Sequence, residues 1–135
     1  MGDPADGRQR IAPLAPFEEE VGFTRALRVG DRIFVSGTVG VEADGSLKED
    51  AGAQADRCYD LIRQHIEALG GHMGDVVRVR MFATDIADAD ALSAAFSRAL
   101  KATRPTATLV AIAALYDPRW KVEIEVDAVI GSGQE

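Results

Sequence analysis

Apolar and acidic side chains alternate strictly over residues 121–129, whose sequence is KVEIEVDAV. Because successive side chains of a strand point to opposite faces, this period of two predicts a half-buried strand. Its polar face carries the carboxylates of Glu123, Glu125 and Asp127. The alternation alone leaves open whether these acids are solvated, take part in an interface or form one half of a ligand site.

The same period predicts strands elsewhere, each bounded by turn-forming residues. They are expected at 23–30, 32–40, 75–85, 106–115 and 121–130. In the third of them, one side is expected to hold Val77, Val79, Met81 and Ala83, and the other Arg78, Arg80, Phe82 and Thr84. The Asp44-Gly45 pair is a hairpin signal, which predicts a turn and one optional short strand beside it.

Two segments change to a spacing of three and four residues, which predicts amphipathic helices at 51–69 and 88–100. Gly70-Gly71 ends the first helix, and Asp88 or Asp90 is placed to cap the second. The apolar stripe of the first helix consists of Ala55, Cys58, Ile62, Ile66 and Leu69. The stripe of the second consists of Leu92, Phe96 and Leu100.

Strands interspersed with two one-sided helices predict an α/β (α+β) fold, in which one sheet carries both helices on one face. The opposite face would then carry a mixed set of side chains, namely Arg78, Arg80, Phe82, Glu123 and Glu125. A face of this composition is unusual if it is left in water, and such faces commonly pack against another subunit. An oligomer is therefore expected.

Composition narrows the partners and the compartment. With 135 residues, the chain is expected to form one domain over 9–135, after a disordered tail over 1–8 that is rich in Gly, Asp and Pro. A net charge of −7 with scattered basic residues argues against nucleic acid as a partner. The single cysteine, the lack of an apolar signal segment and the lack of a membrane-spanning run predict a cytoplasmic protein without a membrane partner.

The sequence lacks the general signatures of metal and cofactor sites. The two histidines, His65 and His72, do not lie in a spacing that gathers the three or four ligands of a metal site. Cys58 belongs to the apolar helix stripe and is interpreted as a small buried residue rather than a nucleophile. The glycines of VGDRIFVSGTVG lack the spacing of a phosphate-binding loop. No metal and no cofactor are therefore expected.

Four stretches, LRVGDRIFVSGTVG, DVVRVRMFATDIAD, RPTATLV and KVEIEVDAV, together resemble the Rid family, also called the YjgF or L-PSP endoribonuclease family. The resemblance covers about Gly22 to Gly131, in the family's order and spacing. It implies a chorismate-mutase-like domain with one mixed sheet, assembled as a homotrimer with small-molecule clefts between subunits. It also implies hydrolysis of reactive imines and enamines without metal or cofactor.

The resemblance assigns site residues to this sequence. Glu123 corresponds to the acid that positions water, and it is the expected catalytic residue. The expected substrate-binding positions are Phe23, Ser36, Gly37, Ser93 and Ala107. In family deaminases the position of Ala107 holds an arginine, which binds the substrate carboxylate through two charged hydrogen bonds. Alanine at this position argues against a standard 2-iminobutanoate/2-iminopropanoate deaminase.

Two other arginines are candidates for the missing guanidinium. Arg80 is expected on the sheet face away from the helices and is included among the substrate-binding residues, as an anchor for an anionic ligand. Arg25 closely follows Phe23 and is the second candidate. For both arginines the alternative is an ion pair with Glu123 or Glu125. Two functions stay open: hydrolysis of an imine-like metabolite, and a non-catalytic trimer that binds a metabolite; ribonuclease activity or RNA binding ranks below both.

Overall fold

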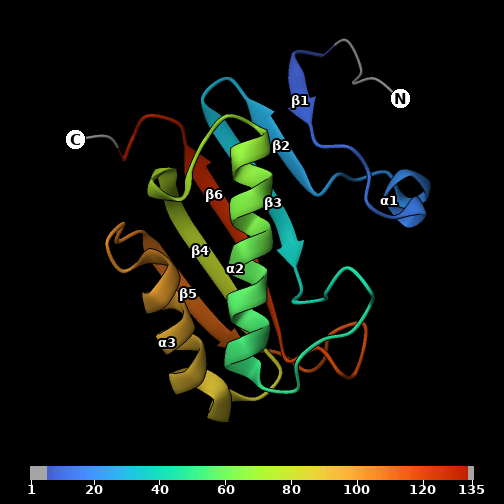
Figure 1. Ribbon diagram of the computed structural model, residues 1–135, viewed down its shortest axis with the longest axis vertical. Helices are drawn as coiled ribbons and strands as arrows, with labels where there is room; N and C mark the ends of the chain where they lie inside the picture. The colour runs from blue at the N-terminus through green and yellow to red at the C-terminus, as the bar shows by residue number, and fades with distance from the viewer. Residues whose placement is uncertain (1–5, 134–135) are drawn as a thin grey trace.

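The computed structural model describes residues 6–133, and within that range six strands form one mixed sheet (Figure 1). The strands are β1 (Arg8–Arg10), β2 (Ala26–Val29), β3 (Arg32–Thr38), β4 (Val76–Ala83), β5 (Thr106–Ala111) and β6 (Val122–Val129). Their order across the sheet is β1-β2-β3-β6-β4-β5. The β4–β5 pair is parallel, and every other described neighbouring pair is antiparallel.

Two long helices, α2 (Ala51–Ala68) and α3 (Ala89–Leu100), lie side by side on one face of this sheet (Figure 1). Shorter helical segments are α1 (Pro16–Val21), η1 (Met73–Asp75) and η2 (Ile86–Asp88). The predicted mixed sheet with two helices on one face is confirmed. The opposite face, called the outer face below, carries neither α2 nor α3.

The helical spacing of apolar residues accounts for the core. All five residues of the predicted α2 stripe are at most 2% exposed, and in α3 Leu92 and Leu100 are buried while Phe96 packs against the core. The Asp50 carboxylate accepts a hydrogen bond from Ala53 N and caps α2. Gly70 follows the helix with φ of 93°, a conformation that favours glycine.

Strand β4 departs from the predicted alternation at its start. The register against β6 shifts between Val76 and Arg78, so an extra residue is inserted at Val77. Val76 is therefore the buried residue at 3% exposure, whereas Val77 is 36% exposed. The prediction that Val77 faces the core with Val79 was wrong, because a bulge reverses the alternation on one side of it.

Other predicted boundaries also need correction. The Asp44-Gly45 turn forms, with Gly45 N donating to Glu42 O at 2.9 Å, but no strand lies beside it. The strand expected to run to residue 115 ends at Ala111. Asp88 is the N-cap residue of α3 without a side-chain capping bond, whereas Asp85 accepts from Ala87 N and caps η2.

The N-terminal segment was expected as a disordered tail over 1–8. Residues 1–5 lie outside the described part of the chain, and Arg8 begins β1, which pairs with β2 at the sheet edge. Neither β1 nor α1 was predicted from the sequence. Both are short, and too few residues repeat in either to give a periodic signal.

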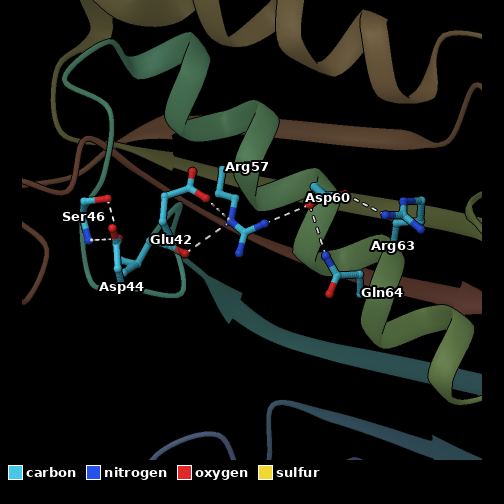
Figure 2. Close-up of polar contacts among 8 residues, drawn as sticks. Glu42, Asp44, Ser46, Arg57, Asp60, Arg63 and Gln64 are labelled. Carbon is cyan, nitrogen blue, oxygen red and sulfur yellow. Dashed lines mark hydrogen bonds and ion pairs between the residues drawn. The ribbon is translucent and has the colours of Figure 1, made fainter.

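A polar network fastens the 41–46 loop to the exposed side of α2 (Figure 2). Arg57 is its centre: the guanidinium donates to Val41 O at 3.3 Å and pairs with Glu42 at 3.4 Å and Asp60 at 2.9 Å. Asp60 in turn accepts from Arg63 and Gln64. Because these acids are paired within the network, it is interpreted as a stabilising feature and not as a reactive site.

Candidate functional site

Strand β6 carries its three acids along the centre of the outer face. Buried and half-buried residues alternate strictly from Val122 to Val129, which confirms the predicted two-sided strand. On β4, the residues opposite Glu123, Glu125 and Asp127 are Phe82, Arg80 and Arg78 in that order. Acids and arginines therefore meet across one ladder, as the mixed face predicted.

The acids are not equivalent. Arg80 Nη1 lies 3.1 Å from Glu125 Oε1 and 4.0 Å from Asp127 Oδ2, and Arg78 lies 3.9 Å from Asp127. Glu123 faces Phe82 instead and makes no ion pair of this kind among the described residues. It is the acid of this row that lacks a directly paired arginine.

A bulge in β3 creates the space in which the Glu123 side chain lies. Val35 pairs with Val126 and Thr38 with Ile124, so Ser36 and Gly37 together stand opposite a single β6 residue. A Cβ added to Gly37 would lie 2.7 Å from the Cδ of Glu123, closer than any real contact. The Glu123 carboxyl group thus occupies the place of a side chain at position 37, and any other residue there would displace it.

Ser36, the other bulged residue, fixes the chain before β2. Its hydroxyl donates to Thr24 O at 2.7 Å, and its backbone N–H donates to Arg25 O at 2.9 Å. The serine hydroxyl is therefore engaged by the backbone. Its position beside Gly37 brings the 23–25 segment next to Glu123.

The Arg25 side chain contacts Gly37, Phe23 and Glu18. Its Nη1 donates to Gly37 O at 3.3 Å, and its Cζ lies 4.9 Å from the centre of the Phe23 ring. Its Nε is 3.7 Å from Glu18 Oε2 and has no hydrogen-bond partner among the described residues. Glu18, in turn, is 2% exposed and accepts from the backbone N–H groups of Leu14 and Ala15.

The electrostatic setting of Glu123 follows from this arrangement. Burial raises the pKa of the Glu123 carboxyl group, Arg25 opposes that rise, and Glu125 adds to it. A carboxylate with a raised pKa takes up and releases protons closer to neutrality, as a general base must.

Two residues weighed in the sequence behave as structural groups. Cys58 is buried, its thiol donates to Thr38 O at 3.2 Å, and burial raises the thiol pKa to about 12. A thiol in that state is not a nucleophile at neutral pH. Burial also lowers the pKa of His65, with Arg25 lowering it further and Glu18 acting in the opposite direction.

A hollow of about 370 Å³ opens on the outer face beside Phe23 and Ser36. Its lining consists of Phe23, Thr24, Leu27, Phe34, Val35, Ser36, Arg80, Glu125 and Asp127. Aromatic and charged side chains thus line one depression, which includes three of the predicted binding residues. A second hollow of about 220 Å³ lies around Trp120, between the end of β4 and the loop before β6.

The structure brings together some of the predicted site residues and separates others. Phe23, Ser36, Gly37, Arg80 and Glu123 share the outer face or its margin. Ser93 is an exposed residue of α3, on the opposite side of the sheet. Ala107 is exposed on the edge strand β5, opposite Val79, whose side chain is in the core beneath the helices. One chain therefore does not assemble the whole predicted set.

Sequence reasoning missed Glu18, which supports Arg25. The sequence gives little indication of this role, because Glu18 stands in a run of three glutamates within PFEEEV. Such a run is typical of a solvated helix end. Only the fold shows that this glutamate is buried while Glu19 and Glu20 are exposed.

Within residues 6–133, no group of three or more His, Cys, Asp or Glu side chains is arranged to hold a metal ion. Also within that range, none of the helices is both long and apolar enough to cross a membrane.

Comparison with known proteins gives relatives over almost the whole chain. The sequence model of a family described as Endoribonuclease L-PSP matches residues 11–130. The fold is similar to that of Rv2704 from Mycobacterium tuberculosis, a member of the YjgF/YER057c/UK114 family, with 32% identity and a TM-score of 0.84. That similarity covers 91% of this chain and 99% of the other.

Two curated proteins extend the comparison. The chain is 30% identical over 125 residues to protein SCO2049 of Streptomyces coelicolor, covering 92% of this chain and 93% of that protein. It is also 30% identical over 111 residues to the 2-iminobutanoate/2-iminopropanoate deaminase of Salmonella typhimurium. The latter match covers 79% of this chain and 84% of the deaminase.

Proposed function

Because the chain belongs to the endoribonuclease L-PSP family, also called the Rid or YjgF family, we propose that it hydrolyses the C=N bond of an imine-like metabolite. The relatives at about 30% identity include an imine deaminase, which supports this reaction class. The observation that carries the proposal is the half-buried Glu123 carboxyl group, which lies over Gly37 and has a raised pKa.

In this reaction the Glu123 carboxylate accepts a proton from a water molecule as the water oxygen forms a bond to the imine carbon. The electron pair of the C=N double bond moves to nitrogen, which takes the proton from the Glu123 carboxyl group, and a tetrahedral amino alcohol results. The hydroxyl proton then passes through the same carboxylate to the amino nitrogen, the C–N bond breaks, and ammonia leaves as the carbonyl group forms. An enamine enters the same sequence after tautomerising to the imine. A positioned general base of this kind contributes roughly 10²- to 10⁴-fold to a rate.

We propose that the site is completed between chains of a homotrimer. The mixed charged and aromatic outer face supports an interface, and Ser93 and Ala107 reach a cleft with Phe23 and Ser36 only if a second chain supplies them. Light scattering at micromolar concentration tests the assembly. A particle of three chains is expected, and a mass near the 14.4 kDa of one chain would contradict it.

The substrate is expected to differ from the small 2-imino acids, because Ala107 offers neither a charge nor a hydrogen-bond donor. An amino-acid oxidase can generate 2-imino acids with side chains of different size from the parent amino acids. Trapping the remaining imine as a semicarbazone then measures its hydrolysis. Faster loss of at least one imine with the wild-type protein than with Glu123→Gln is expected. Equal rates with both proteins over the whole panel would overturn the proposal.

The role of Ala107 is tested in the same assay with 2-aminoacrylate released from serine. The Ala107→Arg variant should accelerate pyruvate formation relative to the wild type, since it restores a bidentate donor. If neither protein accelerates it, Ala107 is not the feature that limits this substrate.

A second candidate is a non-catalytic trimer that binds a metabolite, and the alanine at position 107 is the observation that favours it. Calorimetric binding of a 2-oxo acid without turnover of any imine would support this candidate. Ribonuclease activity is the less favoured reading of the family description, because the chain has a net charge of −7.

A further inference from the structure

We propose that Arg25 is a positioning residue, whose guanidinium holds the Gly37 carbonyl group and thereby fixes the position of the Glu123 carboxyl group. This inference rests on the proposed function and adds a residue that acts on the general base without contacting the substrate. Helix α1 becomes part of the site, because Glu18 of that helix pairs with Arg25. The coupling of Arg25 to Glu123 is measured below without a substrate, so that its failure and the failure of the reaction can be distinguished.

Three consecutive carbonyl groups of the β3 bulge each accept a hydrogen bond from a side chain. The pairs are Thr38 Oγ1 with Ser36 O at 2.8 Å, Arg25 Nη1 with Gly37 O at 3.3 Å, and Cys58 Sγ with Thr38 O at 3.2 Å. Because a bulge disrupts the regular ladder, side-chain donors of this kind fix the backbone where the ladder does not. The middle carbonyl belongs to the glycine against which Glu123 lies, and its side-chain donor is Arg25.

The Arg25 guanidinium is enclosed by groups of the protein. Its Cζ lies 4.9 Å from the centre of the Phe23 ring, and its Nε lies 3.7 Å from Glu18 Oε2. The Nε is buried and has no hydrogen-bond partner within residues 6–133. The described residues that line the outer-face hollow include Phe23 but not Arg25. A guanidinium in this setting acts on its protein neighbours rather than on a ligand.

Glu18 anchors Arg25 from helix α1. It is 2% exposed, and its carboxylate accepts the backbone N–H groups of Leu14 and Ala15 at 3.2 and 3.1 Å. These two bonds fix the acid, and the acid in turn fixes the arginine. Among the described residues the ion pair of Arg25 is with Glu18, so the cation is held near Glu123 without bonding to its carboxylate. The carboxylate therefore stays available as a base.

Arg25 acts on Glu123 through both position and charge. Its hydrogen bond fixes the Gly37 peptide group, and a Cβ on that glycine would stand only 2.7 Å from the Glu123 Cδ. Burial raises the pKa of Glu123, the positive charge of Arg25 opposes that rise, and Glu125 adds to it. On the α2 side, burial and the charge of Glu123 raise the pKa of the Cys58 thiol to about 12, so that this neighbour is neutral.

Titration of the Glu123 carboxyl carbon, followed by NMR, tests the coupling without a substrate. Arg25→Gln should raise the pKa of Glu123, because a nearby positive charge is lost. The matched control is Arg63→Gln, an exposed α2 arginine paired with Asp60 and Glu67, and it should leave this titration unchanged. Arg25→Lys keeps the charge and should return the titration towards that of the wild type. An unchanged titration in Arg25→Gln would overturn the inference.

The semicarbazone assay separates position from charge, on the plateau above the acid limb where Glu123 is ionised in each protein. Arg25→Gln should lower kcat about tenfold or more through misplacement of the base. KM should stay almost unchanged, because Arg25 does not contact the substrate. Arg25→Lys should recover only part of kcat, since an ammonium group lacks the fork that reaches Gly37 O and Glu18 together. A raised KM with an unchanged kcat would overturn the inference.

A double-mutant cycle tests whether Arg25 acts through the base. In a Glu123→Gln background, Arg25→Gln should slow hydrolysis no further. A tenfold effect that persists in this background would show that Arg25 acts on another group, and it would overturn the inference.

One variant and one outcome complete the test. Arg25→Gln leaves the buried Glu18 carboxylate without its cation, which destabilises the fold. Glu18→Gln/Arg25→Gln removes both charges and keeps an amide oxygen for the N–H groups of Leu14 and Ala15, so it should fold and show the same fall in kcat. A wild-type kcat in this double variant would overturn the inference. If the titration of Glu123 depends on Arg25 while the wild type hydrolyses no imine, the coupling of Arg25 to Glu123 is supported and the proposed reaction fails.

Discussion

The carboxyl group of Glu123 lies where the first side-chain carbon of residue 37 would stand, and Gly37 leaves that space open. The bulge at Ser36–Gly37 places both residues opposite one residue of β6. Because Gly37 has no side chain, the carboxyl group of Glu123 can lie against its Cα. A feature of the backbone and the lack of a side chain thus set the position of the expected catalytic group.

Gly37→Ala should displace the Glu123 side chain, because the new Cβ would lie 2.7 Å from its Cδ. We expect a stability loss of about 1–3 kcal/mol, typical of overpacking, and a fall in hydrolysis of about 10²-fold. Denaturant unfolding and the semicarbazone assay measure the two effects. In a Glu123→Ala background the same glycine substitution should cost almost no stability. Equal costs in both backgrounds would contradict the contact.

The hydrolysis rate should decrease on acidification through the raised pKa of Glu123, because only the ionised carboxylate accepts the proton of water. Arg25 lowers this pKa and Glu125 raises it. Arg25→Gln should therefore move the acid limb of the kcat profile to higher pH, and Glu125→Gln should move it to lower pH. Profiles that do not move, or that move in the reverse directions, would show that another group sets the acid limb.

The free energy of unfolding should also depend on pH through the titration of Glu123. Because the pKa of Glu123 is higher in the folded than in the unfolded chain, the folded chain binds more protons between the two values, and stability falls as pH rises through that window. Below the ordinary carboxyl value both states are protonated and the effect is absent. Glu123→Gln should therefore be more stable than the wild type at pH 7 and should lose this advantage near pH 4. Thermal unfolding at the two pH values checks the sign.

The sequence predicted those parts of the fold that repeat. The alternation of β6 and the α2 stripe each bury one side of an element, and the same periodicity that identifies them also fixes their orientation. The two bulges escaped prediction because each inserts a single residue. At Val77 the insertion reversed the expected inward side, and at Ser36–Gly37 it created the space for Glu123.

The candidate site was predicted only in part for a related reason. Glu123, Ser36 and Gly37 lie on neighbouring strands, so a correct sheet order places them together. Arg25 and Glu18 meet through a short helix and the chain that enters β2, where no periodic pattern exists. The sequence favoured Arg80 over Arg25 as the anion-binding residue, and their different carboxylate neighbours appear only in the folded chain.

Gln54 of α2 should be one of the larger single contributors to stability outside the apolar core. It is 1% exposed, its amide donates to Lys48 O and Arg119 O, and its carbonyl accepts from Lys121 N. It thereby holds the loop before α2 and the loop before β6 to the helix. Gln54→Ala leaves three backbone groups without this partner and should cost about 3 kcal/mol. The matched control is Gln64→Ala on the same helix, whose exposed side chain bonds to Asp60 and should cost little.

Arg57 and Arg63 provide a paired test of the network in Figure 2. Arg57 is 21% exposed and joins the 41–46 loop to α2 through Val41 O and Glu42, whereas Arg63 is 43% exposed and bonds only within α2 among the described residues. Arg57→Ala should cost about 1 kcal/mol and increase hydrogen exchange in the loop, because a tertiary connection is lost. Arg63→Ala should change the free energy of unfolding by less than about 0.5 kcal/mol, as exposed helix pairs do. Equal effects of the two substitutions would show that contacts other than those of Arg57 hold the loop to α2.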